Sequence, residues 1–342
     1  MVLTQTLEQT LKISPQRSSL ADYFRLMGIK GCERVFHNAL ELGVLQSLRA
    51  SLGPQTANDI AAACGLAEHP TRLMLDVLTE LGVARREGDL YFSGDVLQLL
   101  QGDYADLSSR YWNYLPEFLR TAKPMFSFNE NSSQESTDQF YATQALSLYA
   151  MMRTSAELLA KDFLASGMAP LRILDIGAGS CVWSLPFARV LQAVAITALD
   201  TPVVLNVAQS LAKNLGLVEK FTYTSAQLFE LPSDLGQFDL ILVGNVMHMF
   251  DEQKNIFLLR SLKRFLAPQG SLVVIDVFSD NPKGQLNVTL YELGLALRLP
   301  GARVYKPSCA SELLSSAGFV VSDVRFIDAE PHTMGYIVAR RA

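Results

Sequence analysis

Apolar residues follow two different periodicities along the chain, and the change lies near residue 165. Between about 20 and 165 they recur every three or four positions, which predicts amphipathic helices. After about 170, short apolar runs alternate with helical patterns, which is typical of a parallel β-sheet whose strands are connected by helices. The pattern therefore predicts two domains, 1–165 and 166–342.

The first domain combines three predicted helices with a short β-ribbon. The helices are expected over 33–50, 56–66 and 69–82, and the last of them is expected to end at its glycine. Thr56 is a suitable N-cap for the second helix, with Asp59 three residues later. Three helices followed by a β-ribbon predict a winged-helix-like module.

The β-ribbon is predicted from Gly88 and Asp89, which are typical of a turn between two short strands. In DNA-binding winged helices the third helix lies in the major groove. Here that helix carries Asp76 and Glu80, whose charges would repel phosphates. The module is therefore expected to serve in packing or dimerisation, with no nucleic-acid partner.

Two further helical stretches, 106–128 and 137–164, are unusually rich in Tyr, Phe, Met and Trp. Such stripes are typical of a core or of a subunit interface. They also suit the wall of a pocket for an apolar ligand, because the methionine side chain adapts to irregular shapes. The two interpretations are compatible.

The second domain is expected to contain five strands in alternation with helices, followed by a pair of strands that forms an antiparallel edge. The five strands are expected over 171–177, 194–200, 220–226, 238–246 and 270–278, and the final pair within 318–342. In a sheet of this kind, ligands bind at the carboxyl ends of the strands.

Composition narrows the class of protein. With 49% hydrophobic and 18% charged residues, the chain is expected to form a large core, and its net charge of −5 does not favour nucleic acid. The four widely spaced cysteines are typical of free thiols in a reducing cytoplasm. No secretory signal or membrane-spanning run is predicted, so a cytoplasmic location is expected.

A glycine-rich loop lies between an apolar strand and an apolar helix in the segment ILDIGAGSCVWSLPFA. Asp175 ends the strand, and Gly177 and Gly179 follow it. The dinucleotide fingerprint requires a third glycine where Val182 stands, and the chain contains no Gly-Lys-Ser/Thr tripeptide of a phosphate-binding loop. Asp200 closes the next strand. Two carboxylates beside such a loop suit a ligand with a ribose and a cationic group, and S-adenosylmethionine fits this description.

At this point the chain resembles the class I S-adenosylmethionine-dependent methyltransferases, in particular the plant- and bacterial-type small-molecule O-methyltransferases. The resemblance covers the chain from about residue 20 onward and rests on the order and spacing of short segments. In the first domain these are ALELGVLQSL, TANDIAAACGL and RLMLDVLTELGVARREGDLYFS. In the second they are LDIGAGS, LDTPVVL, VGNVMHMFDE, LAPQGSLVVIDV and LLSSAGF.

The resemblance implies an α/β fold, in which a Rossmann-like catalytic domain is preceded by a mostly helical, winged-helix-like dimerisation domain. It also implies a homodimer, an S-adenosylmethionine cofactor and a role in secondary metabolism. The family's cofactor loop corresponds to Asp175, Gly177 and Gly179, and its ribose-binding acid corresponds to Asp200.

The chain departs from the family pattern at two cofactor positions. Gln227, followed by Leu228 in the segment AQLF, replaces the acid that contacts the adenine amino group, although a glutamine carbonyl can accept the same hydrogen bond. Cys181 replaces the family's third glycine, which is expected to crowd the start of the helix on the cofactor side.

His248, in the segment GNVMHMFDE, corresponds to the family's catalytic base, and an imidazole can accept a proton near neutral pH. Asp276 corresponds to the acid that orients the base, with a shorter side chain than the usual glutamate. The second supporting acid of the plant enzymes would fall near Cys309, where no acid stands. No metal site is predicted, because the remaining histidines lie outside any motif: His37, His69 and His332.

The leading hypothesis is methyl transfer to a hydroxyl of an apolar aromatic or polycyclic small molecule, with His248 as general base. Transfer to carbon or nitrogen remains open. A second hypothesis is a relative that keeps the cofactor but catalyses hydroxylation, decarboxylation or cyclisation, because Cys181, Gln227 and the missing second acid depart from the family. A third is a transcriptional regulator that uses the winged helix.

Overall fold

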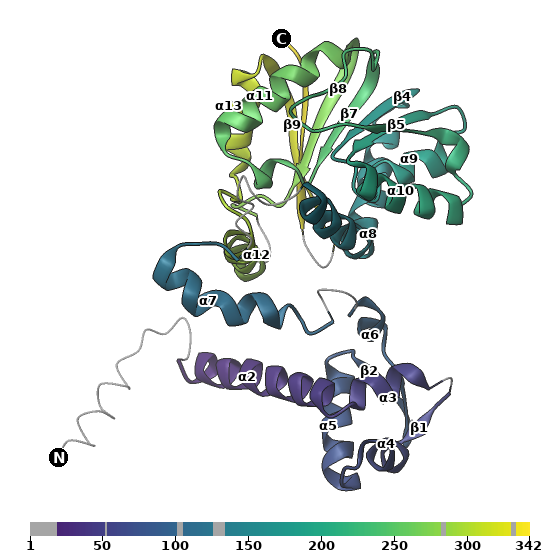
Figure 1. The fold of residues 1–342 in the computed structure, drawn as a ribbon, viewed down its shortest axis with the longest axis vertical. Helices are drawn as coiled ribbons and strands as arrows, with labels where there is room; N and C mark the ends of the chain where they lie inside the picture. Colours follow the sequence, from purple (N-terminus) through teal and green to yellow (C-terminus); the bar gives the residue numbers. More distant parts are fainter. Residues whose placement is uncertain (1–18, 52, 101–104, 126–133, 282–284, 330–332) are drawn as a thin grey trace, which may run out of the picture. The chain divides into compact units, whose positions relative to one another are not determined.

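The chain forms two compact units, Met1–Leu107 and Ser108–Ala342 (Figure 1). The computed structural model describes residues 19–51, 53–100, 105–125, 134–281, 285–329 and 333–342, without the side chains of 134–140. No described helix is long and apolar enough to cross a membrane.

The units divide earlier in the chain than the 165/166 boundary expected from sequence. Helix α7 (Ser109–Thr121) packs against α12 (Gln285–Arg298), and α8 (Gln134–Ala165) packs against α10 (Pro202–Asn214). The two aromatic-rich helices therefore belong to the same unit as the large sheet. Part of the predicted helix 106–128, residues 126–128, lies outside the described residues.

The first unit combines short helices with a three-stranded antiparallel sheet in the order β1–β3–β2. The strands are β1 (Gln55–Thr56), β2 (Ala84–Glu87) and β3 (Leu90–Ser93). The helices are α2 (Ser19–Glu41), α3 (Val44–Ala50), α4 (Ala57–Cys64), α5 (Glu68–Glu80) and α6 (Asp95–Leu99). The single helix predicted over 33–50 is wrong, because Gly43 has φ +79° and separates α2 from α3.

Local signals in this unit are confirmed. The Thr56 hydroxyl accepts a hydrogen bond from the Asp59 backbone N–H at 3.1 Å, and the Asp59 carboxylate accepts one from the Thr56 N–H at 2.8 Å, which is a capping box at the start of α4. Asp76 of α5 accepts hydrogen bonds from Tyr91 at 2.7 Å and Arg86 at 2.8 Å, both on the β-ribbon. Burial, reinforced by the bond to Asp76, raises the pKa of Tyr91 to about 12.

The second unit is built on a seven-stranded sheet in the order β6–β5–β4–β7–β8–β10–β9. Strands β4 to β8 are mutually parallel, and β10 pairs antiparallel with both β8 and β9, as predicted. The bounds are β4 (Arg172–Ile176), β5 (Ala195–Asp200), β6 (Phe221–Ser225), β7 (Phe238–Gly244), β8 (Leu266–Asp276), β9 (Phe319–Ile327) and β10 (Met334–Arg341).

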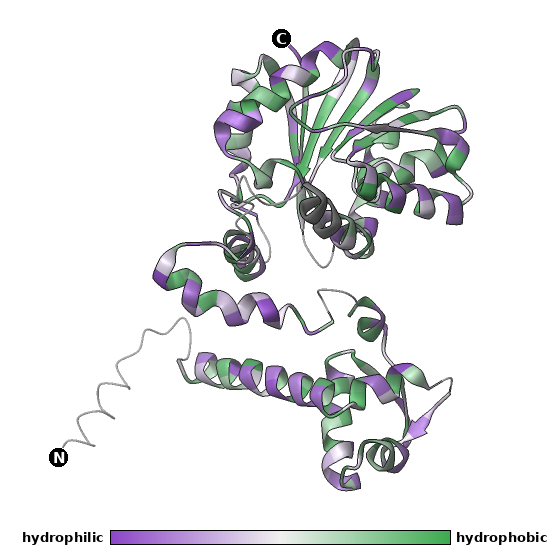
Figure 2. Ribbon diagram, viewed as in Figure 1, coloured by the Kyte–Doolittle hydropathy of each residue, from purple (hydrophilic) through white to green (hydrophobic). Residues whose placement is uncertain are grey.

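Helices cover both faces of this sheet, whose strands are largely apolar (Figure 2). The remaining helical segments are α9 (Leu185–Val190), α11 (Glu252–Leu262), α13 (Pro307–Ser316) and the short 3₁₀ segments Val218–Lys220, Met247–Met249 and Lys263–Phe265. Successive residues of β4 point to opposite faces: Ile173 joins the core beneath α8 and α9, whereas Leu174 joins the core beneath α11 and α13. The chain order reverses between β4 and β7, which is where such sheets bind ligands.

Candidate active site

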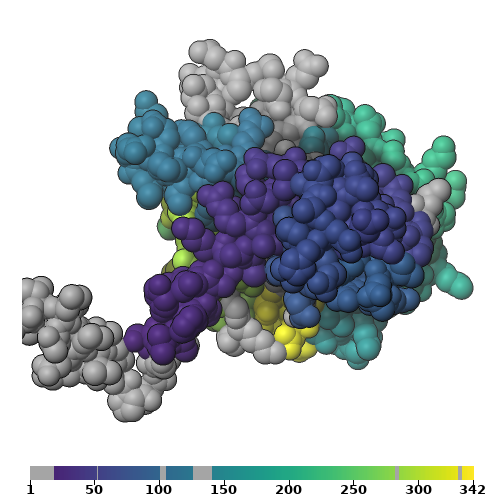
Figure 3. Space-filling view, turned by 90° about the horizontal axis from the view of Figure 1, so that it is seen from below, coloured from purple at the N-terminus to yellow at the C-terminus, as the bar shows by residue number. Residues whose placement is uncertain are grey.

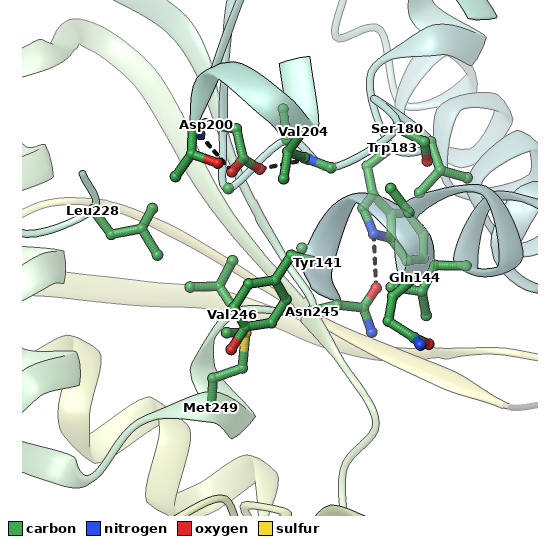
Figure 4. Close-up of a pocket in the computed structure, with 18 of the residues that line it drawn as sticks. Tyr141, Gln144, Ser180, Trp183, Asp200, Val204, Leu228, Asn245, Val246 and Met249 are labelled. Atoms are coloured by element: carbon green, nitrogen blue, oxygen red, sulfur yellow. Dashed lines mark hydrogen bonds between the residues drawn. The ribbon is translucent and has the colours of Figure 1, made fainter. Parts of the chain in front are cut away.

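A cavity of about 340 Å³ lies at this point of reversal (Figure 4). Its walls come from the loops that follow β4, β5, β6 and β7, and from α8. The volume lies within the range of about 300–1,000 Å³ that is usual for small-molecule sites. Among the predicted cofactor residues, those that line the cavity are Gly177, Gly179, Asp200, Gln227 and Leu228.

The two loop glycines are required for different reasons. Both have positive φ, +60° at Gly177 and +56° at Gly179, which other residues rarely adopt. A Cβ on Gly177 would lie 2.8 Å from a methyl group of Val246, whereas a Cβ on Gly179 would have no atom within 4 Å. Gly177 therefore allows the loop to pack on the segment after β7, and Gly179 leaves open space above the loop.

Asp200 joins the loop to the end of β5. Its Oδ2 accepts a hydrogen bond from the Gly179 N–H at 2.9 Å, and its Oδ1 accepts one from the Thr201 N–H at 2.8 Å. Tyr141 of α8 lines the same cavity, and its pKa is raised to about 12 by burial and by the negative charge of Asp200. The carboxylate is thus held in place at the cavity wall.

Asp175 lies outside this cavity. It is 1% exposed, it is not among the residues that line the cavity, and it shares the β4 face of Ile173 beneath the loop. The Ser184 hydroxyl donates a hydrogen bond to it at 2.5 Å, and burial raises its pKa to about 7. The expected position beside a cationic ligand group is therefore not found, because the alternation of β4 directs this side chain into the protein.

Cys181 also differs from expectation. Its backbone has φ +60°, which explains why a glycine suits this position. Its side chain is fully buried in the core on the α9 side of the sheet and does not line the cavity. The predicted crowding on the cofactor side is therefore wrong, and Cys181 gives no support to altered chemistry.

His248 lies in the short segment Met247–Met249 that follows β7, and it is 7% exposed. Its Nδ1 lies 2.7 Å from Oδ1 of Asp276, and its backbone N–H donates to Oδ2 at 3.2 Å. The Val277 N–H donates to the same carboxylate at 2.9 Å. The Tyr291 ring and the imidazole form a T-shaped pair, with centroids 5.8 Å apart. The predicted pair is therefore brought together at the carboxyl ends of β7 and β8.

The imidazole does not line the cavity of 340 Å³, but its neighbours Val246 and Met249 do. Cys309, near which the second supporting acid of the plant enzymes would fall, is exposed on α13. Among the described side chains, no group of three His, Cys, Asp or Glu residues is arranged to hold a metal ion.

Sequence reasoning missed several residues of the cavity wall. Ser180 and Thr201 follow the ends of predicted strands, and Asn245 lies at the end of one, so the rule that ligands bind there could have indicated them. Tyr141 and Gln144 come from α8, within the stretch 137–164 whose composition suits a pocket wall, although the pattern singles out no residue there. The missed residues therefore come both from the loops and from a helix that is distant in the sequence.

Three buried polar atoms of the cavity wall have no hydrogen-bond partner among the described residues: Ser180 Oγ, Thr201 Oγ1 and Asn245 Nδ2. Leaving such an atom unpaired costs about 1–3 kcal/mol, so a polar ligand that pairs with them is favoured. With the Asp200 carboxylate and the open space above Gly179, these groups fit the ribose and amino-acid parts of S-adenosylmethionine.

The fold and this site define a class I methyltransferase. A family model of the O-methyltransferase domain matches residues 112–320, and a model of the O-methyltransferase dimerisation domain matches residues 30–100. The chain belongs to this O-methyltransferase family. It is an S-adenosylmethionine-dependent methyltransferase with an N-terminal dimerisation domain.

Individual relatives are distant but cover nearly the whole chain. The 3-hydroxy-5-methyl-1-naphthoate 3-O-methyltransferase of Streptomyces sahachiroi is 25% identical over 89% of this chain and 90% of its own. The mitomycin biosynthesis 6-O-methyltransferase of Streptomyces lavendulae is 26% identical over 84% and 85%. The structure of human N-acetylserotonin methyltransferase in complex with SAM superposes with a TM-score of 0.69 at 21% identity, covering 97% of this chain and 99% of that one.

Proposed function

We propose that the protein methylates a hydroxyl oxygen of an aromatic or polycyclic small molecule of secondary metabolism, with His248 as the general base. Bound S-adenosylmethionine supplies the methyl group as an activated sulfonium. The protein's tasks are then to align the acceptor oxygen and to remove its proton. The His248–Asp276 pair is the observation that carries this proposal.

The pair is suited to proton removal because the carboxylate determines which nitrogen is free. An ionised carboxylate only accepts hydrogen bonds, so Nδ1 of His248 carries the proton that Asp276 accepts at 2.7 Å. In the neutral ring Nε2 is then unprotonated and can accept a proton. Asp276 also receives the backbone N–H groups of His248 and Val277, so it holds the ring and its segment together.

The nature of the acceptor is inferred from the relatives and from the surroundings of His248. Two relatives are named for oxygen methylation, one on a hydroxynaphthoate and one in mitomycin biosynthesis. In this chain Tyr291 meets the imidazole in a T-shaped contact, and Tyr291, Tyr149 and Met151 are partly buried against the core on the α8 side of the sheet. An aromatic acceptor can stack on such side chains.

We assign the adenosine end of the cofactor to Asp200, Gln227 and Leu228. Asp200 accepts hydrogen bonds from the ribose hydroxyls, and the Gln227 carbonyl accepts one from the adenine amino group. Gly177 and Gly179 allow close approach to the loop. Asp175 supports this loop from beneath through Ser184.

We also propose that the protein is a homodimer formed through its first unit. The N-terminal part of α2 exposes large apolar side chains, each 52–62% accessible: Leu20, Tyr23, Phe24, Leu26, Met27 and Ile29. Helix α2, in purple, is exposed in the view of Figure 3. An apolar surface of this kind is typical of a subunit interface.

Substitution of the base tests the catalytic proposal. His248→Ala is expected to reduce kcat by about 10²–10⁴-fold, the usual contribution of acid–base catalysis. The affinity for S-adenosylhomocysteine, measured by calorimetry, is expected to remain unchanged because the cavity wall does not include His248. Asp276→Asn is expected to have a smaller effect on kcat, since it removes the charge and one acceptor oxygen but leaves an oxygen that can accept a hydrogen bond from the ring.

A folded His248→Ala variant that turns over at the wild-type rate would contradict the base assignment and favour carbon methylation. Labelled S-adenosylmethionine tests the reaction class separately. Transfer of the label to an oxygen of a hydroxyaromatic acceptor is expected, whereas product formation without transfer would support the alternative of a non-methyl reaction.

A further inference from the structure

A tryptophan and an asparagine are joined across the loops that follow β4 and β7. The indole Nε1–H of Trp183 donates a hydrogen bond to Oδ1 of Asn245 at 3.0 Å. The Trp183 ring packs on Gly244 so closely that a Cβ there would lie 2.2 Å from a ring atom. Asn245 has φ +57°, a conformation that asparagine tolerates better than most residues. Both side chains are therefore held in one arrangement.

This contact determines the direction of the Asn245 amide. An indole nitrogen can only donate a hydrogen bond, so the amide atom that faces Trp183 must be the oxygen. Nδ2, which has two N–H donors, is left on the other side of the amide. It is enclosed and has no hydrogen-bond partner among the described residues. The hydroxyl of Ser180, a residue that is 2% exposed, is likewise without a partner in the described part of the chain.

The Asn245 amide and the Trp183 ring lie on the same side of the cavity. Figure 4 shows Asp200 and Leu228 on one side of the cavity and Trp183, Asn245 and Gln144 on the other. Asp200 is the sole charged residue among the described residues that line the cavity. The end that contains Asn245 therefore offers neutral donors and no lysine or arginine.

We propose that Asn245 Nδ2 binds the carboxylate of the cofactor's amino-acid end, and that Trp183 is the positioning residue that directs the amide. This inference rests on the assignment of Asp200 to the ribose, because an extended cofactor then reaches the opposite end of the cavity. A carboxylate is an acceptor for the amide N–H groups, and hydrogen bonds to a charged group are the stronger kind. Without a cation, recognition depends on the direction of the dipoles, which explains the role of Trp183.

The test compares two ligands that differ only in the carboxylate. The affinities of S-adenosylhomocysteine and of its decarboxylated analogue, which keeps the ammonium group, are measured by calorimetry for the wild type and for Asn245→Gly. Glycine tolerates the positive φ of this position, so the substitution removes the amide without straining the backbone. The preference of the wild type for S-adenosylhomocysteine is expected to fall by about tenfold in the variant, with little change for the decarboxylated analogue.

Two further substitutions test the charge of the ligand group that Asn245 contacts and the positioning role of Trp183. Asn245→Asp places a negative charge beside the carboxylate. It is therefore expected to weaken the binding of S-adenosylhomocysteine and to leave the affinity for the decarboxylated analogue unchanged or higher. Trp183→Phe keeps a ring on Gly244 but removes the donor. It is expected to reduce the preference for the carboxylate less than Asn245→Gly does.

Tyr223→Phe is a matched control. It removes another buried hydroxyl that has no partner among the described residues, but Tyr223 does not line the cavity. Both affinities are expected to remain at the wild-type value in this variant.

Three results would overturn the proposal. Equal weakening of both ligands by Asn245→Gly would place the amide elsewhere on the cofactor. Tighter binding of S-adenosylhomocysteine by Asn245→Asp would indicate contact with the ammonium group. Unchanged affinities with a raised KM for the methyl acceptor would assign the amide to the acceptor oxygen. The ribose assignment is tested separately with 5′-methylthioadenosine, which lacks the amino-acid part. Asp200→Asn is expected to weaken the binding of this ligand.

Discussion

At the scale of single residues, Asp175 shows how burial changes the behaviour of a carboxyl group. Its side chain lies beneath the glycine loop, where removal from water disfavours the charged form and raises its pKa to about 7. The hydrogen bond from Ser184 opposes this shift, and the charge of Asp200 adds to it. The group is therefore partly protonated near neutral pH in the folded protein.

This raised pKa predicts a pH-dependent stability. Between the ordinary value near 4 and about 7, the folded state binds a proton that the unfolded state has lost, so the free energy of unfolding falls as the pH rises. One such group contributes a slope of up to about 1.4 kcal/mol per pH unit. Asp175→Asn keeps an acceptor for Ser184 and is expected to remove this contribution.

Urea unfolding of the wild type and Asp175→Asn between pH 5 and 8 measures the effect. The variant is expected to gain stability relative to the wild type as the pH rises, with the difference levelling off above the folded pKa. A constant difference across this range would show that Asp175 titrates at its ordinary pKa in the folded protein.

At the scale of elements, the two glycines of the loop between β4 and α9 meet different requirements, one for stability and one for ligand binding. Gly177 and Gly179 have nearly the same positive φ, so alanine at either position costs about 1 kcal/mol in backbone strain. At Gly177 the added methyl group would also meet Val246 at 2.8 Å, whereas at Gly179 it would enter open space.

Gly177→Ala is therefore expected to lower the free energy of unfolding by about 2–3 kcal/mol, and Gly179→Ala by about 1 kcal/mol. Gly179→Ala is expected to show the greater loss of S-adenosylhomocysteine affinity relative to its loss of stability, because its methyl group faces the cavity. Denaturant unfolding and calorimetry of both variants provide the comparison. Adding Val246→Ala should recover part of the stability of Gly177→Ala, and no recovery would contradict the steric explanation.

At the scale of the whole molecule, the exposed apolar face of α2 predicts self-association. Light scattering at micromolar concentration is expected to give the mass of two chains. Phe24→Glu, which places a charge on that face, is expected to shift the protein to the monomer. Val190→Glu is the matched control, because Val190 is also 62% exposed but lies on α9 of the second unit. A monomeric wild type, or a dimer that only Val190→Glu disrupts, would contradict the assignment.

The sequence determined the class of fold and the main part of the cofactor loop. Short apolar runs in alternation with helical patterns predicted the parallel strands, and a final pair of strands predicted the antiparallel edge, because each of these patterns is local in the sequence. Gly177, Gly179, Asp200 and His248 each lie at or after the end of a predicted strand, and the carboxyl ends of parallel strands meet at one edge of the sheet.

Only the tertiary structure decided which side chains face the cavity and which segments complete it. Asp175 turned inward because the sheet is covered by α9 on the face that the strand presents there. The division of the chain before α7 followed from the packing of α7 against α12 and of α8 against α10, which no local pattern encodes. The bond between Trp183 and Asn245 joins residues far apart in the chain. It exists because β4 and β7 are neighbours in the sheet, and strand order is set by the packing of the whole domain.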